Sequence, residues 1–155
     1  MKKRMNEPVT TFNFEETNRE LVEVFTNVMW VEESAIRKGP FFDLSVKEVH
    51  TIDAISMYEH KSASEVAKLI HLTPSAMTTA IDRLVEKGYV ERCRSKRDRR
   101  VVELALTHVG RVVYRAHQEF HRGLTHSLFE NMSTHEISTL QRAIHNLKHY
   151  LISLI

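Results

Sequence analysis

Apolar residues recur every three or four positions along most of the chain, and this spacing predicts six amphipathic helices. With only four glycines and three prolines to interrupt them, we expect long helices and a mainly α fold. The predicted spans are about Phe14–Arg37, Ser45–Tyr58, Ser62–Ile70, Thr73–Lys87, Thr107–Glu130 and Ser133 to the last residue. In the second to fourth helices, the residues expected to face inward are Val49, Ile52, Ile55, Val66, Leu69, Met77, Ile81 and Leu84.

Short capping signals mark where four of these helices begin. In a Ser-x-x-Glu sequence the serine side chain accepts from a backbone N–H, and the glutamate accepts from the N–H of the serine. Such sequences begin at Ser45, Ser62 and Ser133. Before the fourth helix, Thr73 is a cap and Pro74 takes the first helical position, while Gly88 is expected to end that helix.

Between residues 89 and 106 the apolar period changes to two, which is typical of strands. Tyr89–Arg94 and Val102–Leu106 are predicted to form a β-hairpin with a polar tip at Ser95–Arg99. The hairpin directly follows two short helices that only His71 and Leu72 separate. Such a helix pair suits a helix-turn-helix, whose second helix enters the major groove of DNA.

The last helix has the most regular apolar pattern in the chain. Its apolar residues are spaced 3, 4, 3, 4 and 3 apart, as in the a and d positions of a coiled coil. They are Ile137, Leu140, Ile144, Leu147, Leu151 and Leu154. We expect this face to pack against a second copy of the chain in a symmetric homodimer, and the alternative is an intramolecular bundle.

Composition limits the class of protein. A chain of 155 residues that is 42% hydrophobic and 27% charged suits one globular domain. Its apolar runs are too short to cross a membrane, and no apolar segment of a signal peptide follows the basic N-terminus, so we expect a cytoplasmic protein. One cysteine, Cys93, excludes an intramolecular disulfide and a cysteine-rich metal cluster.

The exposed side of the fourth helix carries small and polar residues, which let a backbone approach DNA closely and donate to phosphates or base edges. On its own, an ordinary solvated helix face would explain them equally well. Five of the seven residues from Arg94 to Arg100 are basic, although the net charge of the whole chain is only +2. Such a crowded tip is favoured if it meets an anion such as the minor groove, and the alternative is a solvated basic loop. Asp98 is expected to hold a neighbouring guanidinium in place. The predicted DNA-contacting residues are Ser62, Ser64, Thr73, Ser75, Ala76, Thr78, Thr79, Asp82, Arg83, Arg94, Lys96, Arg97, Asp98, Arg99 and Arg100.

The order of these motifs resembles the MarR family of winged helix-turn-helix regulators over essentially the whole chain. The resemblance rests on the helix pair, then Gly88–Arg92, then Asp98-Arg99-Arg100, then Leu106-Thr107-x-x-Gly110. It implies a single domain, with residues 14–44 and 107–155 forming dimerisation helices and residues 45–106 forming the DNA-binding lobe. It also implies that Arg100 enters the minor groove, that Arg99 meets phosphate, and that the target is double-stranded DNA with an inverted repeat.

Within that family, the chain is similar to the repressors of fatty-acid-synthesis genes in streptococci and their relatives. The similar stretches are Ser45–Asp53, Gly88–Arg92, Arg97–Val102 and His117-x-x-Phe120-His121. This resemblance implies that acyl carrier protein loaded with a long acyl chain is the co-repressor, and it gives residues 1–13 no role. Apolar residues that could line an acyl tunnel, or simply form the core, are Phe25, Val28, Met29, Phe41, Phe42, Ile52, Ile55, Val113 and Phe120. Basic residues that could dock the acidic carrier are Arg37, Lys38 and Lys47.

The histidines support a competing hypothesis. His117 and His121 stand four apart, so both rings face one side of a helix, which suits two metal ligands. Together with Glu32 and His50 they resemble the site of zinc-sensing members of the MarR family, and zinc would take these four groups in a tetrahedron. The additional acidic and cysteine ligands of those sensors are not found. A buried histidine bonded to Glu32 or Glu33 would explain the pattern without metal, so no cofactor is predicted.

Other classes explain the pattern less well. The chain contains no glycine-rich phosphate loop and no nucleophile elbow, so we do not expect an enzyme. Cys93 lies beside arginines that could lower its pKa, which leaves a peroxide-sensing thiol as an alternative. A dimeric scaffold without DNA binding would leave the basic hairpin tip unexplained.

Overall fold

The structure is a computed structural model that describes residues 12–95 and 98–155. The chain divides into two compact units, residues 1–48 and residues 49–155, and each is described by itself. Among the described residues, no helix has the length and apolar character needed to cross a membrane.

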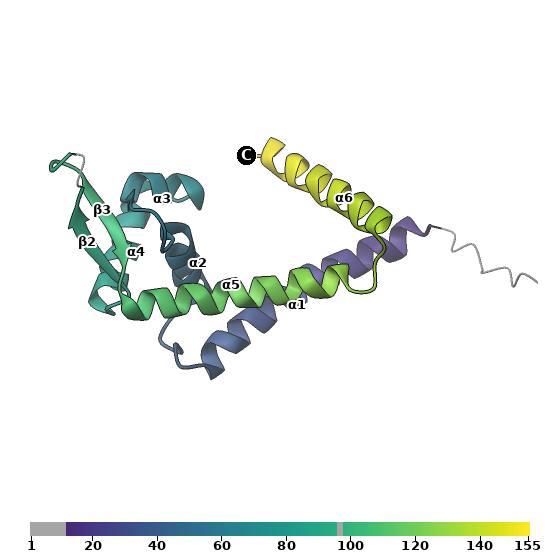
Figure 1. The fold of residues 1–155 in the computed structure, drawn as a ribbon, viewed down its shortest axis with the longest axis horizontal. Helices are drawn as coiled ribbons and strands as arrows, with labels where there is room; N and C mark the ends of the chain where they lie inside the picture. Colours follow the sequence, from purple (N-terminus) through teal and green to yellow (C-terminus); the bar gives the residue numbers. More distant parts are fainter. Residues whose placement is uncertain (1–11, 96–97) are drawn as a thin grey trace, which may run out of the picture. The chain divides into compact units, whose positions relative to one another are not determined.

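Helices make up most of the described chain, and a small antiparallel sheet accompanies them, with two of its strands between the fourth and fifth helices (Figure 1). The helices are α1 (Phe14–Lys38), α2 (Val46–Ile55), α3 (Ala63–Leu69), α4 (Pro74–Glu86), α5 (His108–Phe129) and α6 (Thr134–Ser153). The strands are β1 (Lys61–Ser62), β2 (Val90–Arg94) and β3 (Val102–Leu106). The predicted fold class, a mainly α winged helix-turn-helix, is confirmed.

The capping signals begin the helices where the sequence predicts. In all three Ser-x-x-Glu boxes, the serine Oγ accepts from the glutamate N–H and the carboxylate accepts from the serine N–H. Thr73 caps α4 by accepting from the N–H of Ala76, with Pro74 in the first turn. At the other end, Gly88 has a φ of 80°, and the N–H of Tyr89 donates to the carbonyl of Leu84 at 2.9 Å. This pattern is the glycine-dependent helix end expected there.

The sheet has the order β1-β3-β2, and its central strand β3 pairs with both neighbours. The hairpin of β2 and β3 was predicted, and its register sets Cys93 opposite Glu103. The two-residue strand β1 was not predicted, because a two-residue strand is too short to show an alternating pattern. It pairs Ser62 with Glu103 and so attaches the start of α3 to the sheet.

The core of the second unit lies between the helices of the winged lobe and its sheet. It contains Val49, Ile52, Ile55, Val66, Ala67, Met77, Ile81, Leu84, Val90, Leu104, Leu106 and Val113. The prediction that Leu69 belongs to the core is wrong, because this residue is 56% exposed. With about 100° of turn per residue, the buried arc of α3 is centred between Val66 and Ala67, and Leu69 lies outside it.

The second helix is shorter than predicted. It ends at Ile55, three residues before Tyr58, because Ser56 adopts a φ of 68°. That left-handed conformation cannot continue a right-handed helix. The segment that follows it leads directly into β1.

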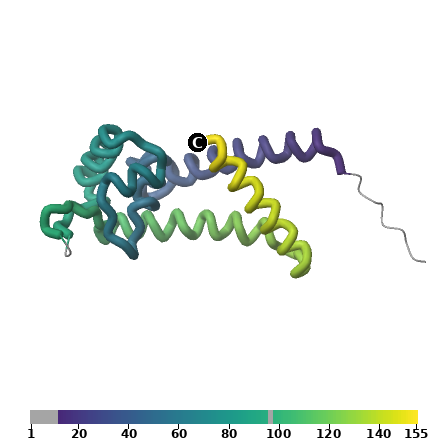
Figure 2. Tube along the Cα trace, turned by 90° about the horizontal axis from the view of Figure 1, so that it is seen from above, coloured from purple at the N-terminus to yellow at the C-terminus, as the bar shows by residue number. Residues whose placement is uncertain are grey.

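A single glycine allows α5 to start against the end of α4. A Cβ built on Gly110 would lie 2.1 Å from the backbone oxygen of Tyr89, so no other residue fits there without displacing the chain. Thr107 secures the same junction, since its Oγ1 donates to the carbonyl of Gly88 at 2.8 Å and accepts from the N–H of Gly110. The Leu-Thr-x-x-Gly sequence therefore joins the sheet to α5. From this junction α5 runs without a break to Phe129 (Figure 2).

The two long terminal helices carry apolar side chains that the isolated chain leaves exposed. No residue of α6 is buried, and Leu154 exposes 63% of its surface. In the first unit, α1 is capped by Asn13 and leaves Phe25 51% exposed. Faces of this kind on single helices are typical of an interface with another chain.

Candidate nucleic-acid interface

The turn between α3 and α4 fixes the direction of the second helix of the pair. His71 adopts a φ of 55°, and the N–H of Leu72 donates to the carbonyl of Ala67 at 2.9 Å. This is the helix-ending bond usually made around a glycine, formed here with histidine in the left-handed region. The turn therefore holds α4 against α3 with its capped N-terminus exposed.

The predicted DNA-contacting residues of α4 lie on its exposed face, while Met77, Ile81 and Leu84 occupy the buried one. The exposed residues are Ser75, Ala76, Thr78, Thr79, Asp82 and Arg83, together with Thr73 at the cap and Ser64 on α3. The hydroxyls of Thr78 and Thr79 donate to carbonyls one turn earlier, at 3.0 and 3.2 Å, and keep lone pairs to accept from outside. Ser62 is only half exposed, and its hydroxyl is bonded within the capping box of α3.

Arg92 contributes to this surface, and its role was not predicted from the sequence. Its Nη2 lies 2.6 Å from Oδ1 of Asp82, so an ion pair joins strand β2 to helix α4. Both side chains are partly exposed, so the pair contributes little to stability and mainly fixes the side chain of Asp82. No sequence pattern reveals this pair, because ten residues and a change from helix to strand separate its members.

The described part of the hairpin tip is held by hydrogen bonds between side chains and the backbone. Arg94 donates from Nη1 to the carbonyl of Arg99 at 2.9 Å, and Asp98 accepts from the backbone N–H of Arg100 at 2.9 Å. The expectation that Asp98 holds a neighbouring guanidinium stays a prediction, because Arg97 beside it lies outside the described residues. An aspartate two residues before an N–H forms a compact turn of its own.

The basic side chains at this tip remain available to a ligand. Arg99 and Arg100 are exposed. Lys96 and Arg97, which the sequence also placed at the interface, lie outside the described residues.

Comparison with known proteins identifies the family of this lobe. The sequence profile of the MarR family matches residues 44–102. The HTH-type transcriptional regulator YpoP of Bacillus subtilis is 31% identical over 101 residues, which are 63% of this chain and 70% of YpoP. This chain belongs to the MarR family. The HTH-type transcriptional regulator YwhA of the same species is 33% identical over 93 residues, 59% of this chain and 67% of YwhA.

One solved structure extends the similarity to nearly the whole chain. The crystal structure of Streptococcus pneumoniae FabT in complex with DNA is 38% identical and superposes with a TM-score of 0.82. The match covers 92% of this chain and 100% of the FabT chain. The protein is therefore a MarR-family DNA-binding transcriptional regulator, and its family and fold are those of regulators rather than enzymes.

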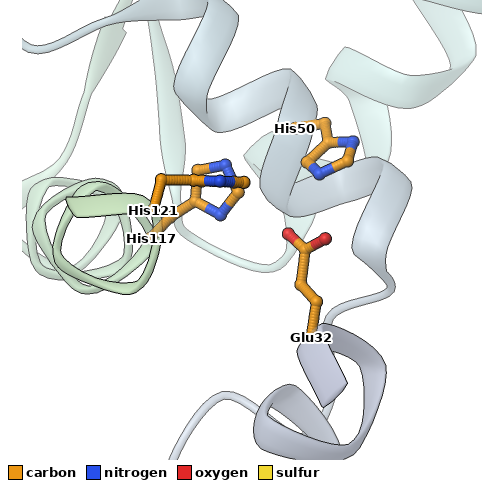
Figure 3. Close-up of side chains that lie close together, drawn as sticks. All are labelled: Glu32, His50, His117 and His121. Atoms are coloured by element: carbon orange, nitrogen blue, oxygen red, sulfur yellow. The ribbon is translucent and has the colours of Figure 1, made fainter. Parts of the chain in front are cut away.

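Three of the predicted metal ligands lie together in the second unit of this MarR-family chain. The ring centroids of His117 and His121 are 4.4 Å apart on α5, and those of His50 and His117 are 5.2 Å apart (Figure 3). Each ring offers one nitrogen as a ligand atom, and these three nitrogens lie within 4.8 Å of one another. Glu32, the fourth predicted ligand, is a buried residue of α1 in the first unit.

The residues predicted to contact an acyl chain are distributed over both units. Ile52, Ile55 and Val113 are buried and Phe120 is half-buried in the second unit. The remaining predicted contacts, in the first unit, are Phe25, Val28, Met29, Phe41 and Phe42. Ordinary core packing also buries Ile52 and Ile55, so the acyl-chain assignment stays a prediction.

The predicted carrier-docking residues Arg37, Lys38 and Lys47 are all exposed. Arg37 already makes an ion pair of 2.6 Å with Glu33 one turn before it. An exposed pair of this kind costs little to rearrange. The docking assignment, like the acyl-chain assignment, stays a prediction.

The cysteine environment differs from that of a reactive thiol. Burial raises the pKa of the Cys93 thiol, and the nearby carboxylates of Glu103 and Glu91 raise this pKa further. The expected lowering of this pKa by neighbouring arginines is therefore wrong, because burial and the charges of two carboxylates raise it. A raised pKa lowers the thiolate fraction on which peroxide chemistry depends.

Proposed function

We propose that this MarR-family regulator is a cytoplasmic, homodimeric repressor of fatty-acid-synthesis genes, with long-chain acyl-acyl carrier protein as its co-repressor. The observation that carries the proposal is the 38% identity to FabT over 92% of this chain and all of FabT. Repression would strengthen when acylated carrier protein is abundant and weaken when acyl chains are scarce.

The proposed DNA complex uses two parts of the winged lobe. The capped end of α4 enters the major groove, where Ser75, Thr78 and Thr79 contact phosphates and base edges. The hairpin tip reaches the minor groove, where Arg100 is inserted and Arg99 meets phosphate. The exposure of all five side chains supports this assignment.

A symmetric dimer is proposed because two lobes are needed to read an inverted repeat. Half-sites for such a dimer lie about one helical turn apart. The exposed apolar residues Leu151 in α6 and Leu154 at its C-cap support a second copy of the chain as the cover for this helix. Burying them between two chains would provide the hydrophobic free energy of dimerisation.

Fluorescence anisotropy on the upstream promoter of a fatty-acid-synthesis gene tests this proposal. The protein is titrated alone, with long-chain acyl-acyl carrier protein and with unloaded carrier protein, at one fixed salt concentration. Tighter binding with the acylated carrier alone is the expected result. Equal affinity for DNA with loaded and unloaded carrier would reject acyl-chain sensing. It would not contradict the proposal that the protein binds DNA.

The grouping of His50, His117 and His121 favours a second candidate function, a zinc-responsive regulator. Zinc binds neutral imidazole nitrogens, and the spacing of these three rings suits three of the four predicted ligands, of which Glu32 is the fourth. In the same anisotropy titration, zinc would then tighten DNA binding, and His121→Gln would abolish the response. This candidate would be eliminated if the dialysed wild-type protein took up no zinc.

A further inference from the structure

Three side chains that can bind a metal ion, each of different chemistry, meet on the small sheet. They are separate from the histidine cluster of α5, His117 and His121. They are His60 just before β1, Cys93 on β2 and Glu103 on β3. A sulfur, an imidazole nitrogen and a carboxylate oxygen all lie within 4.8 Å of one another. The proposed DNA complex gives none of these residues a role.

The register of the sheet brings these residues to one face. Cys93 is directly opposite Glu103, and Glu103 is directly opposite Ser62. Residues opposite each other in a sheet point to the same side, and His60 precedes Ser62 by two residues, so its side chain takes that side as well. Each ligand therefore comes from or adjoins a different strand of the order β1-β3-β2.

The distances match those of a small tetrahedral site. Sγ of Cys93 lies 3.8 Å from Nδ1 of His60, and the same Nδ1 lies 3.5 Å from Oε2 of Glu103. With zinc bonds of about 2.3 Å to sulfur and about 2.0–2.1 Å to nitrogen or oxygen, a tetrahedral angle separates sulfur from nitrogen by about 3.5 Å and nitrogen from oxygen by about 3.4 Å. A shift of a few tenths of an ångström would close the site around an ion.

The surroundings leave one coordination position accessible. His60 and Glu103 line a pocket of about 870 Å³, whose other walls include Lys61, Glu65 and Ser95. Water can therefore reach the exposed side of the site at His60 and Glu103. Three protein ligands and one water complete a tetrahedron.

We propose that His60, Cys93 and Glu103 form a binding site for a borderline-soft divalent cation of the zinc class. A thiolate excludes magnesium and calcium, which take oxygen ligands, while the imidazole and carboxylate suit zinc or cobalt. The bound ion joins all three strands. It thereby restrains the hairpin, whose basic tip begins at Arg94, the residue after the cysteine.

Cobalt substitution tests the site directly, because the chain contains one cysteine. The reduced full-length protein is titrated with Co²⁺, and the thiolate-to-cobalt charge-transfer band in the near ultraviolet is recorded. The histidine cluster of α5 contains no sulfur, so this band reports Cys93 alone. We expect the band to appear, to saturate at one ion per chain and to disappear when Zn²⁺ is added.

Four variants decide between this site and other modes of binding. Cys93→Ser removes the band, and His60→Gln and Glu103→Gln each weaken Co²⁺ binding about tenfold or more. The control, His117→Gln combined with His121→Gln, leaves the band unchanged. His60 is exposed, so its replacement leaves the fold intact, which circular dichroism verifies.

Two results would overturn the proposal. One is the absence of a charge-transfer band at saturating Co²⁺ in the wild-type protein. The other is a band of unchanged affinity in both His60→Gln and Glu103→Gln, because the thiolate would then bind the ion without its neighbours.

Discussion

Two glycines of α5 show how differently the same residue type acts within one helix. Gly110 faces the backbone oxygen of Tyr89, which a Cβ would approach to 2.1 Å. Gly123 has nothing within 4 Å of the corresponding position. The first glycine is therefore required by a close contact between backbones, while the second only weakens the helix.

Gly110→Ala should destabilise the protein by about 1–3 kcal/mol or more, because backbone rather than a flexible side chain has to move. The free energy of unfolding, measured in urea, checks this expectation. Gly123→Ala is the matched control and should stabilise α5 by about 0.5–1 kcal/mol. Similar effects of the two substitutions would show that the junction between Tyr89 and α5 is looser than described.

The thiol of Cys93 should react slowly with iodoacetamide at neutral pH. Burial and the carboxylates of Glu103 and Glu91 raise its pKa, so little thiolate is present until the pH exceeds the ordinary value for cysteine. Mass spectrometry of alkylation rates across pH, with a free cysteine peptide as reference, measures the midpoint. A midpoint below that of the peptide would restore the peroxide-sensing alternative.

Elements whose ends depend on local chemistry were predictable from the sequence. The boxes at Ser45, Ser62 and Ser133 and the Thr73-Pro74 start act within four residues, so a single sequence is enough to reveal them. The strand Lys61–Ser62 and the exposure of Leu69 were not predictable, because packing against distant parts of the chain decides both.

The candidate interface follows the same division. The exposed face of α4 and the basic tip could be predicted from helical spacing and charge. The ion pair between Asp82 and Arg92, and the turn in which Asp98 holds the backbone of Arg100, depend on three-dimensional placement. The grouping of His60 with Cys93 likewise results from a sheet register between residues 33 positions apart.

The capping box of α3 should make stability depend on pH. Hydrogen bonds from the backbone and side chain of Ser62 lower the pKa of Glu65 from its ordinary value of 4.5. Its ionised form therefore adds stability that is fully present above pH 4.5 and is lost as the pH falls through the lowered pKa.

Glu65→Gln tests this contribution, because glutamine keeps an acceptor and removes only the charge. Urea unfolding should show a larger difference between wild type and variant at pH 7 than at pH 3. In a Ser62→Ala background the pH-dependent part of the difference should shrink. A difference that is constant with pH in both backgrounds would contradict the assigned hydrogen bonds.

At the scale of the whole molecule, the proposed dimer would cover the exposed apolar residues of α6 with a second chain. The coiled-coil spacing predicted this face from sequence, and within the chain no residue of α6 is buried. Leu151→Glu places a charge on the face and should convert the dimer to a monomer. Analytical ultracentrifugation measures the outcome.

Asn146→Glu serves as the control for the dimer, because Asn146 is an exposed residue of α6 outside the apolar series. It should leave the dimer intact. If Leu151→Glu also remained a dimer of unchanged affinity, α6 would not form the interface.

The central claim is that the winged lobe reads DNA with α4 and the hairpin tip. Fluorescence anisotropy of wild type and Arg100→Ala on a promoter duplex with an inverted repeat tests it most directly, with Arg122→Ala on α5 as the matched arginine control. We predict that Arg100→Ala weakens binding by about 1–3 kcal/mol, roughly 5- to 150-fold, and that Arg122→Ala binds like wild type. Equal affinities of Arg100→Ala and wild type for this duplex would contradict the account.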